Sequence, residues 1–94
     1  MPAELTDKFK RSLRGQAHRL KPVVQIGKEG LTDSVVAAVD SALLTHELIK
    51  VKLNQNSLED KNDVAAALSE RLEALLVQRI GKTIILYRER PPEQ

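Results

Sequence analysis

The chain has 94 residues, of which 41% are hydrophobic and 30% are charged, and its formal net charge is +2. This composition is globular rather than disordered, and the length fits one domain with a small core, for which we expect one layer of helices on one sheet. The absence of cysteine excludes disulfides and thiolate metal sites. Because no apolar run could span a bilayer and no signal peptide follows Met1, we expect a cytoplasmic protein without membrane attachment.

The charged residues are distributed unevenly along the chain. Residues 1–28 carry seven Lys or Arg and two acids, a net +5, whereas residues 29–49 carry four acids and no Lys or Arg, a net −4. This segregation predicts one basic face and one acidic back, although each block could also be an ordinary solvated surface. A basic face beside a glycine-rich loop favours a polyanionic partner.

The chain begins with a predicted helix over residues 5–18, in which apolar residues recur every four positions. This stripe consists of Leu5, Phe9, Leu13 and Ala17. A short strand at 22–26 follows, with Pro22 at its first position, where the missing N–H costs no ladder bond. A second helix runs from Thr32, its expected cap, to about His46.

The loop Gly27-Lys28-Glu29-Gly30 joins this strand directly to the second helix. Its glycines allow a sharp turn and let backbone N–H groups approach a ligand with no Cβ between them. The helix N-terminus directs unpaired N–H groups and its dipole to the same point, and Lys28 adds a mobile cation, so the corner suits a phosphate. The same loop could also be a tight turn with no ligand.

Residues 48–53 alternate as a half-buried strand does, with Ile49, Val51 and Leu53 on one face and Lys50 and Lys52 on the other. A polar turn at 54–57 precedes a third helix over roughly 58–74, with Ser57 as its expected cap. Its inward residues are expected to be Leu58, Val64, Ala65, Leu68, Leu72 and Leu75. Strands at 77–80 and 83–88 form a hairpin around Gly81-Lys82.

The element order is therefore α-β-α-β-α-β-β, an α/β single domain. A strand-helix-strand unit implies a right-handed parallel crossover, and the closing hairpin makes the four-stranded sheet mixed. The shared core is expected to contain Val35, Val39, Leu43, Leu68, Leu72, Ile49 and Val51. The glycine loop lies at the carboxyl end of a strand, where open sheets often bind ligands.

No catalytic motif is found. His18 and His46 do not have metal-ligand spacing, Ser34 and Ser41 lack a nucleophile elbow, and Gly30 is not followed by a Walker A sequence. We therefore expect neither an enzyme nor a cofactor or metal. The only aromatic residues are Phe9, which belongs to the apolar stripe, and Tyr87, so a base-stacking platform is not expected. A basic protein of this kind should contact phosphate and sugar and read shape more than sequence.

Several segments together resemble a known family. They are Leu13 to Ala17, His18, Leu20-Lys21-Pro22, Gly27-Lys28-x-Gly30-Leu31-Thr32, His46 to Lys52 and Ile80-Gly81-Lys82. In this order, over about residues 3 to 90, they resemble the CRM domain family (chloroplast RNA splicing and ribosome maturation). The similarity is to its small stand-alone bacterial type, which is associated with precursors of the large ribosomal subunit.

The resemblance implies an RNA-binding domain over residues 1–90 with a loose tail at 91–94, and a fold like the C-terminal domain of a bacterial translation initiation factor. It implies RNA contacts by the loop residues Gly27, Lys28, Glu29 and Gly30, extended by the basic residues Lys21, Lys50, Lys52 and Lys82. The implied function is ribosome assembly, through binding of large-subunit precursor ribosomal RNA by a monomer. The alternative is a protein-interaction module that docks on ribosomal or assembly proteins through the acidic back, with little RNA affinity.

Overall fold

The computed structural model describes residues 7–54 and 60–89. Its elements, in the predicted order, are α1 (Asp7–Ala17), β1 (Val24–Ile26), α2 (Asp33–His46), β2 (Leu48–Leu53), α3 (Lys61–Leu72), β3 (Leu75–Ile80) and β4 (Thr83–Tyr87). The strands form one sheet in the order β1-β2-β4-β3, in which β1 is parallel to β2 and the other pairs are antiparallel. The predicted α/β fold with a four-stranded mixed sheet is confirmed.

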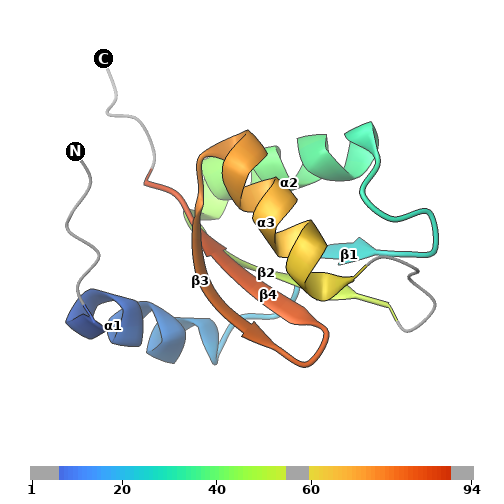
Figure 1. Ribbon diagram of the computed structural model, residues 1–94. Helices are drawn as coiled ribbons and strands as arrows, with labels where there is room; N and C mark the ends of the chain where they lie inside the picture. The colour runs from blue at the N-terminus through green and yellow to red at the C-terminus, as the bar shows by residue number, and fades with distance from the viewer. Residues whose placement is uncertain (1–6, 55–59, 90–94) are drawn as a thin grey trace, which may run out of the picture.

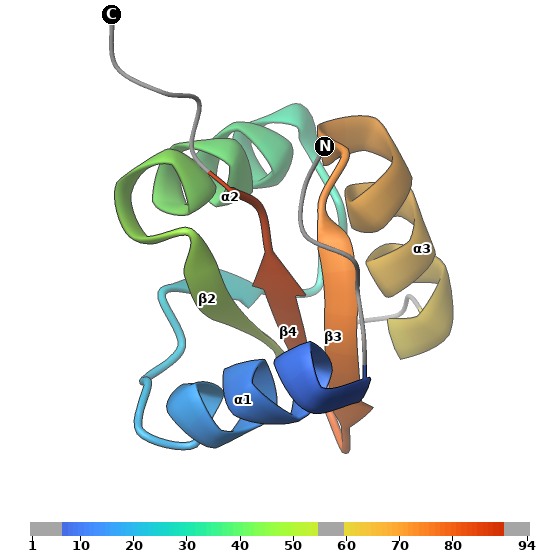
Figure 2. The same cartoon turned by 90° about the vertical axis from the view of Figure 1, so that its left-hand side faces the viewer.

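Both faces of the sheet are covered by helices, so the expected single helical layer is wrong. Helices α2 and α3 cover one face, and α1 crosses part of the other (Figures 1 and 2). The central strand β4 shows why a second layer forms, because its consecutive residues Ile84, Ile85 and Leu86 are all buried. Successive side chains of a strand point to opposite faces, so apolar surface on both faces has to be buried.

The core beneath α2 and α3 is the larger of the two. The predicted core residues Val39, Leu43, Leu68, Ile49 and Val51 are buried in it, and Val35 and Leu72 pack against it while partly exposed. The core beneath α1 is smaller, with Leu13, Ala17, Leu48, Val77 and Ile85 buried and with Phe9, Leu20, Leu75 and Tyr87 packed around them. The predicted stripe of α1 is thus the apolar surface of the second layer. Leu5, its first member, lies outside the described residues.

Helix α2 begins as the sequence predicts. The Oγ1 of Thr32 accepts a hydrogen bond from the N–H of Val35 at 3.2 Å, which makes Thr32 the N-cap. Asp33 follows in the first turn, where its charge is favourable for the helix dipole. The start of α2 is therefore fixed by the side chain of Thr32, two residues after the glycine loop.

Helix α3 is shorter than predicted at both ends. Asp60 caps it, with its Oδ1 accepting from the N–H of Asn62 at 2.6 Å, while Ser57 and Leu58 lie outside the described residues. At the other end Glu73 adopts the left-handed conformation, with φ 53°, and stops the helix without a glycine. Leu75 consequently belongs to β3, not to α3, and packs in the core beneath α1. Strand β3 thus begins two residues earlier than the predicted strand at 77–80.

The hairpin of β3 and β4 turns at Gly81, whose φ is 55°. A positive φ at the first central position suits the predicted two-residue turn. Strand β4 ends at Tyr87, one residue before the predicted end. The pairing of β4 with β3 stops there, because Tyr87 lies opposite Leu75, the first residue of β3.

Arg88 joins the end of β4 to both helices of the larger layer. Its guanidinium donates to the carbonyl oxygen of Leu72 at 2.9 Å and lies 2.9 Å from the carboxylate of Asp40. It also donates to the Asp40 carbonyl oxygen at 3.3 Å, and the Arg88 N–H donates to the carbonyl of Glu47. A charge-assisted and largely shielded arginine of this kind stabilises the packing of three elements.

Candidate nucleic-acid interface

Charge is separated across the sheet. Residues 7–21, which form α1 and the first part of its connection to β1, carry six Lys or Arg and one acid, a net +5. Residues 33–47 and 60–73, which form α2, α3 and their caps, carry seven acids and two Lys or Arg, a net −5. Because these segments cover opposite faces (Figure 2), the molecule has a basic side and an acidic side. This arrangement agrees with the predicted basic face and acidic back.

The glycine loop is a tight turn whose two glycines differ. The N–H of Gly30 donates to the carbonyl of Gly27 at 3.0 Å, and Gly30 is buried with φ 74°. The fold therefore favours glycine at position 30, whether or not a ligand binds. Gly27 does not have a positive φ, and a Cβ added there would meet the Asn54 Nδ2 at 3.8 Å, an ordinary contact. The free protein gives no steric reason for glycine at position 27.

Unused hydrogen-bond donors remain in the middle of the loop. Within the described part of the chain, the backbone N–H groups of Lys28 and Glu29 donate to no protein acceptor. They lie beside the start of α2, and the loop together with Thr32 and Val35 lines a shallow hollow of about 380 Å³. These donors suit an anion. The carboxylates of Glu29 and Asp33 oppose one, so Lys28 and its neighbours have to supply the positive charge.

Two predicted lysines belong to the same end of the sheet as the loop. Lys52 is exposed and is paired with Gln25 of β1 and Thr83 of β4. Lys82 lies in the hairpin, and its carbonyl accepts from the Leu53 N–H at 2.7 Å. The ends of β1 and β2 are also joined directly, since the Asn54 N–H donates to the Ile26 carbonyl at 2.8 Å. The structure thus brings Lys28, Lys52 and Lys82 to one end of the sheet.

The other two predicted lysines lie farther along β1 and β2. Lys50 is on the same face of β2 as Lys52 but is partly buried, opposite Ile85 beneath α1. Lys21 precedes β1, at the end remote from the glycine loop, and lines a groove beside α1. The predicted residues therefore do not form one cluster. They follow the basic side of the sheet from one end of β1 to the other.

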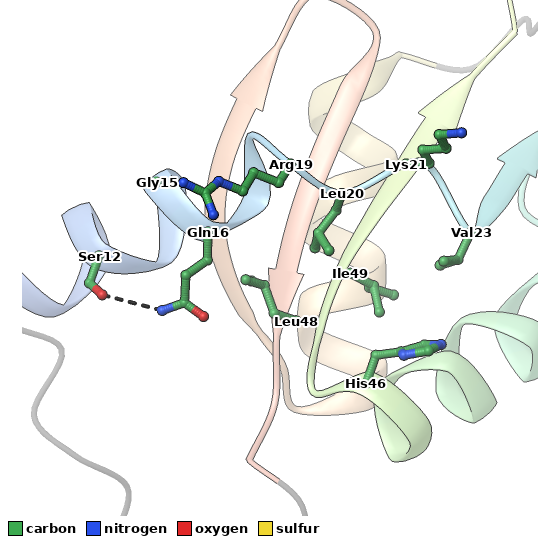
Figure 3. Close-up of a pocket in the computed structure, with 10 residues that line it drawn as sticks. All are labelled: Ser12, Gly15, Gln16, Arg19, Leu20, Lys21, Val23, His46, Leu48 and Ile49. Atoms are coloured by element: carbon green, nitrogen blue, oxygen red, sulfur yellow. Dashed lines mark hydrogen bonds between the residues drawn. The ribbon is translucent and has the colours of Figure 1, made fainter.

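Sequence reasoning missed the groove beside α1 as a site (Figure 3). Arg19 and His46 line it together with Lys21, although they come from the α1–β1 connection and the end of α2. No binding role was predicted for either residue: Arg19 was counted toward the net charge, and His46 was judged unsuitable as a metal ligand and otherwise belonged to a segment that resembles the family. The signal was the run of basic residues before β1, but only the fold shows that His46 lies next to it.

Neither aromatic side chain offers a platform for bases. The rings of Phe9 and Tyr87 meet edge to face, with centroids 5.6 Å apart and planes at 81°, and both residues are partly buried. Burial raises the pKa of Tyr87, and the charges of Glu47 and Glu89 raise it further. The aromatic pair is therefore part of the smaller core, as expected for Phe9.

Two kinds of feature, a metal-binding cluster and a membrane-spanning helix, are absent from the described residues. No group of three His, Asp or Glu residues within them could hold a metal ion. In the same residues, no helix is both long and apolar enough to cross a membrane.

Comparison with known proteins places this geometry in a family. The model of the CRS1 / YhbY (CRM) domain matches residues 5–88. The "Probable RNA-binding protein YqeI" of Bacillus subtilis is 52% identical over 85 residues, which are 90% of this chain and 88% of YqeI. An "RNA-binding protein" of Haemophilus influenzae is 44% identical over 84 residues, which are 89% of this chain and 85% of that protein.

A solved structure has the same fold. The solution structure of SAV1595 from Staphylococcus aureus superimposes with a TM-score of 0.79 and 43% sequence identity, covering 97% of this chain and 95% of that protein. The similarity therefore includes all three layers and not only the loop.

Proposed function

Because the chain belongs to the CRS1 / YhbY (CRM) domain family, as its sequence motifs indicated, we propose that it binds RNA through the basic side of its sheet. The observation that carries this proposal is the separation of charge across the sheet, a net +5 over residues 7–21 against a net −5 in the opposite layer. The relatives are named as RNA-binding proteins and not as enzymes, in agreement with the prediction that the chain is not an enzyme.

The RNA backbone is the chemically matched ligand for this surface. Phosphates meet Lys28, Lys52 and Lys82 at one end of the sheet and Lys21 at the other, with Lys50 between them. The N–H groups of Lys28 and Glu29 provide donors that do not depend on side-chain charge. Without an exposed aromatic platform, most affinity comes from phosphate and sugar contacts and from the shape of the RNA.

We further propose that the RNA is precursor ribosomal RNA of the large subunit and that the protein acts as a monomeric assembly factor in the cytoplasm. The support for this narrower function is the resemblance to the small stand-alone CRM proteins. Crosslinking in cells, followed by sequencing of the bound RNA, tests it. Enrichment of large-subunit precursor RNA over messenger RNA is the expected result, and an even distribution over cellular RNA contradicts it.

The dependence of affinity on salt tests RNA binding itself. If about five phosphates are neutralised, the slope of log K against log salt concentration should be near −4, since each contact contributes about −0.9 on duplex and −0.7 on single strands. Binding is measured by fluorescence anisotropy at salt concentrations from about 50 to about 300 mM, a range over which counterion release makes the affinity for RNA fall steeply. A nearly flat response contradicts RNA binding as the main activity and supports docking on proteins through the acidic layer.

A further inference from the structure

The groove beside α1 combines apolar walls with a cationic rim. It has a volume of about 950 Å³ and opens between the C-terminal half of α1, the connection to β1 and the start of β2. Figure 3 shows Leu20, Leu48 and Ile49 gathered in its middle, with Arg19 and Lys21 above them in this view and His46 below. Val23, the remaining apolar residue of the wall, is 47% exposed.

We propose that this groove holds one unpaired nucleoside of the bound RNA, with its base against the apolar wall and the flanking phosphates on Arg19 and Lys21. The inference rests on the proposed RNA binding and adds a second contact to it, remote from the glycine loop. Such a nucleoside provides both an apolar face and two adjacent negative charges. The lining matches this combination, because it contains no acidic residue.

A glycine inside α1 points to an occupant that comes close to the helix. Gly15 lies in the groove wall, its φ is not positive, and an added Cβ would meet nothing within 4 Å. The free protein therefore gives no reason for a glycine there, although glycine in a helix interior costs about 0.5–1 kcal/mol relative to alanine. A missing side chain at position 15 keeps the helix backbone open to a ligand in the groove.

The start of β2 adds a hydrogen-bond donor and an acceptor to the groove. The carbonyl of Glu47 accepts from Arg88 on the β4 side, whereas the carbonyl of Lys50 accepts from the Val23 N–H on the opposite side. Backbone groups of successive residues in a strand alternate in direction, so the N–H and carbonyl of Leu48 face away from β4, toward the groove. Strand β1 does not reach them, since its pairing with β2 begins at Val51.

This edge fits a base better than a peptide strand. In the described part of the chain, only three backbone groups are open on this edge before Val23 bonds the Lys50 carbonyl: the N–H and carbonyl of Leu48 and the N–H of Lys50. An added peptide strand depends on a longer row of such bonds. A nucleobase needs only one donor and one acceptor, side by side on its Watson–Crick edge. The groove should therefore accept any of the four bases, because each has one donor beside one acceptor on its Watson–Crick edge.

The test compares a fluorescent single-stranded RNA of ten nucleotides with an abasic oligomer of the same length, which keeps the phosphates but has no bases. We expect the wild-type protein to bind the first about tenfold more tightly, in line with the contribution of one buried base. Gly15→Leu fills the groove from the helix side and should bind both RNAs with the wild-type affinity for the abasic oligomer. Its slope of affinity against salt should remain that of the wild type.

Two further variants control for folding and for the nature of the wall. Gly15→Ala removes the helix glycine with little filling, so it should melt at a higher temperature and keep most of the preference for bases. Val23→Asn makes the half-exposed wall polar without filling the groove and should lower the preference several-fold. If Gly15→Leu does not fold, Val23→Asn carries the test alone.

The outcomes separate this inference from the proposed function. Equal wild-type affinity for the two RNAs with a steep salt slope overturns the nucleoside site and leaves RNA binding standing. Full preference for bases in folded Gly15→Leu or Val23→Asn also overturns it. A flat salt slope in the wild type contradicts the proposed function and the nucleoside site together.

Discussion

The two faces of the sheet differ in both packing and charge. The face under α2 and α3 is sealed by a large core and carries a net negative layer, whereas the face under α1 has a small core and a net positive layer. Beyond α1, that second face still exposes Gln25, Lys52 and Ile80, the last 51% exposed. If RNA binds as proposed, stability depends mainly on one face and binding on the other. Substitutions can therefore separate the two properties.

The largest effect is expected in the core beneath α2 and α3. Leu43→Ala removes a fully buried side chain and should lower the free energy of unfolding by about 2–5 kcal/mol, as measured by urea denaturation. Leu44→Ala is the matched control, since Leu44 is the next residue of the same helix and 47% exposed, and should cost much less. A loss below about 1 kcal/mol for Leu43→Ala contradicts the described core.

Two substitutions in the glycine loop should have different effects, one on stability and the other on RNA binding. Gly30→Ala forces a side chain into a left-handed conformation and should cost about 1–2 kcal/mol of unfolding free energy. Gly27→Ala should leave the melting temperature nearly unchanged but weaken RNA binding, because its Cβ fits the protein and not a closely approaching phosphate. If Gly27→Ala binds RNA as the wild type does, the loop is only a turn. Lys52 and its neighbours would then be the main contact.

Two variants that each lose one positive charge, one on either side of the molecule, test whether RNA affinity depends on the basic side. Lys52→Gln should weaken RNA binding several-fold and make the salt slope shallower by about 0.7–0.9, the share of one phosphate contact. Lys61→Gln, at the start of α3 in the acidic layer, removes the same charge and should change the affinity little. Equal losses for the two variants, each measured by anisotropy, indicate a net-charge effect and no localised binding face.

The smallest effect concerns the core beneath α1. Tyr87 is the only tyrosine and the chain has no tryptophan, so absorbance at 295 nm reports its ionisation directly. Burial first, and then Glu47 and Glu89, raise its pKa above 10.0, so the folded protein holds this proton more tightly than the unfolded chain. The resulting stabilisation is complete below pH 10 and is lost as the pH rises through the folded-state pKa. A titration midpoint equal to that of the urea-unfolded chain contradicts the packing of Tyr87.

Most of the fold could be predicted from local patterns. The alternation of residues 48–53, the cap at Thr32 and the turn at Gly81 each have a short-range cause, and the structure confirms them. The end of α3 could not be predicted, because Glu73 takes the left-handed conformation that sequence rules reserve mainly for glycine. Leu75 continues the helical spacing past that point, so periodicity alone assigned it to the wrong element.

The candidate site was less predictable than the fold. A sequence shows that Lys21, Lys50 and Lys52 are basic, but only the sheet register shows that Lys52 lies beside the loop and that Lys21 lies at the other end. The difference between Gly27 and Gly30 depends on a φ angle and on the space that Asn54, which is distant in sequence, leaves for a Cβ at position 27. The groove depends on two stretches of the chain, residues 12–23 and 46–49, that meet only after folding.

The strand order has a consequence for how the chain acquires its structure during synthesis. In the order β1-β2-β4-β3 the strand made last occupies an inner position, between β2 and β3. The side chain of Arg88, which follows it, then joins α2 to α3. A nascent chain that ends before β4 has no strand to connect β2 with β3 and leaves both apolar layers incomplete. We expect cooperative folding only after residues 83–88 have left the ribosomal exit tunnel.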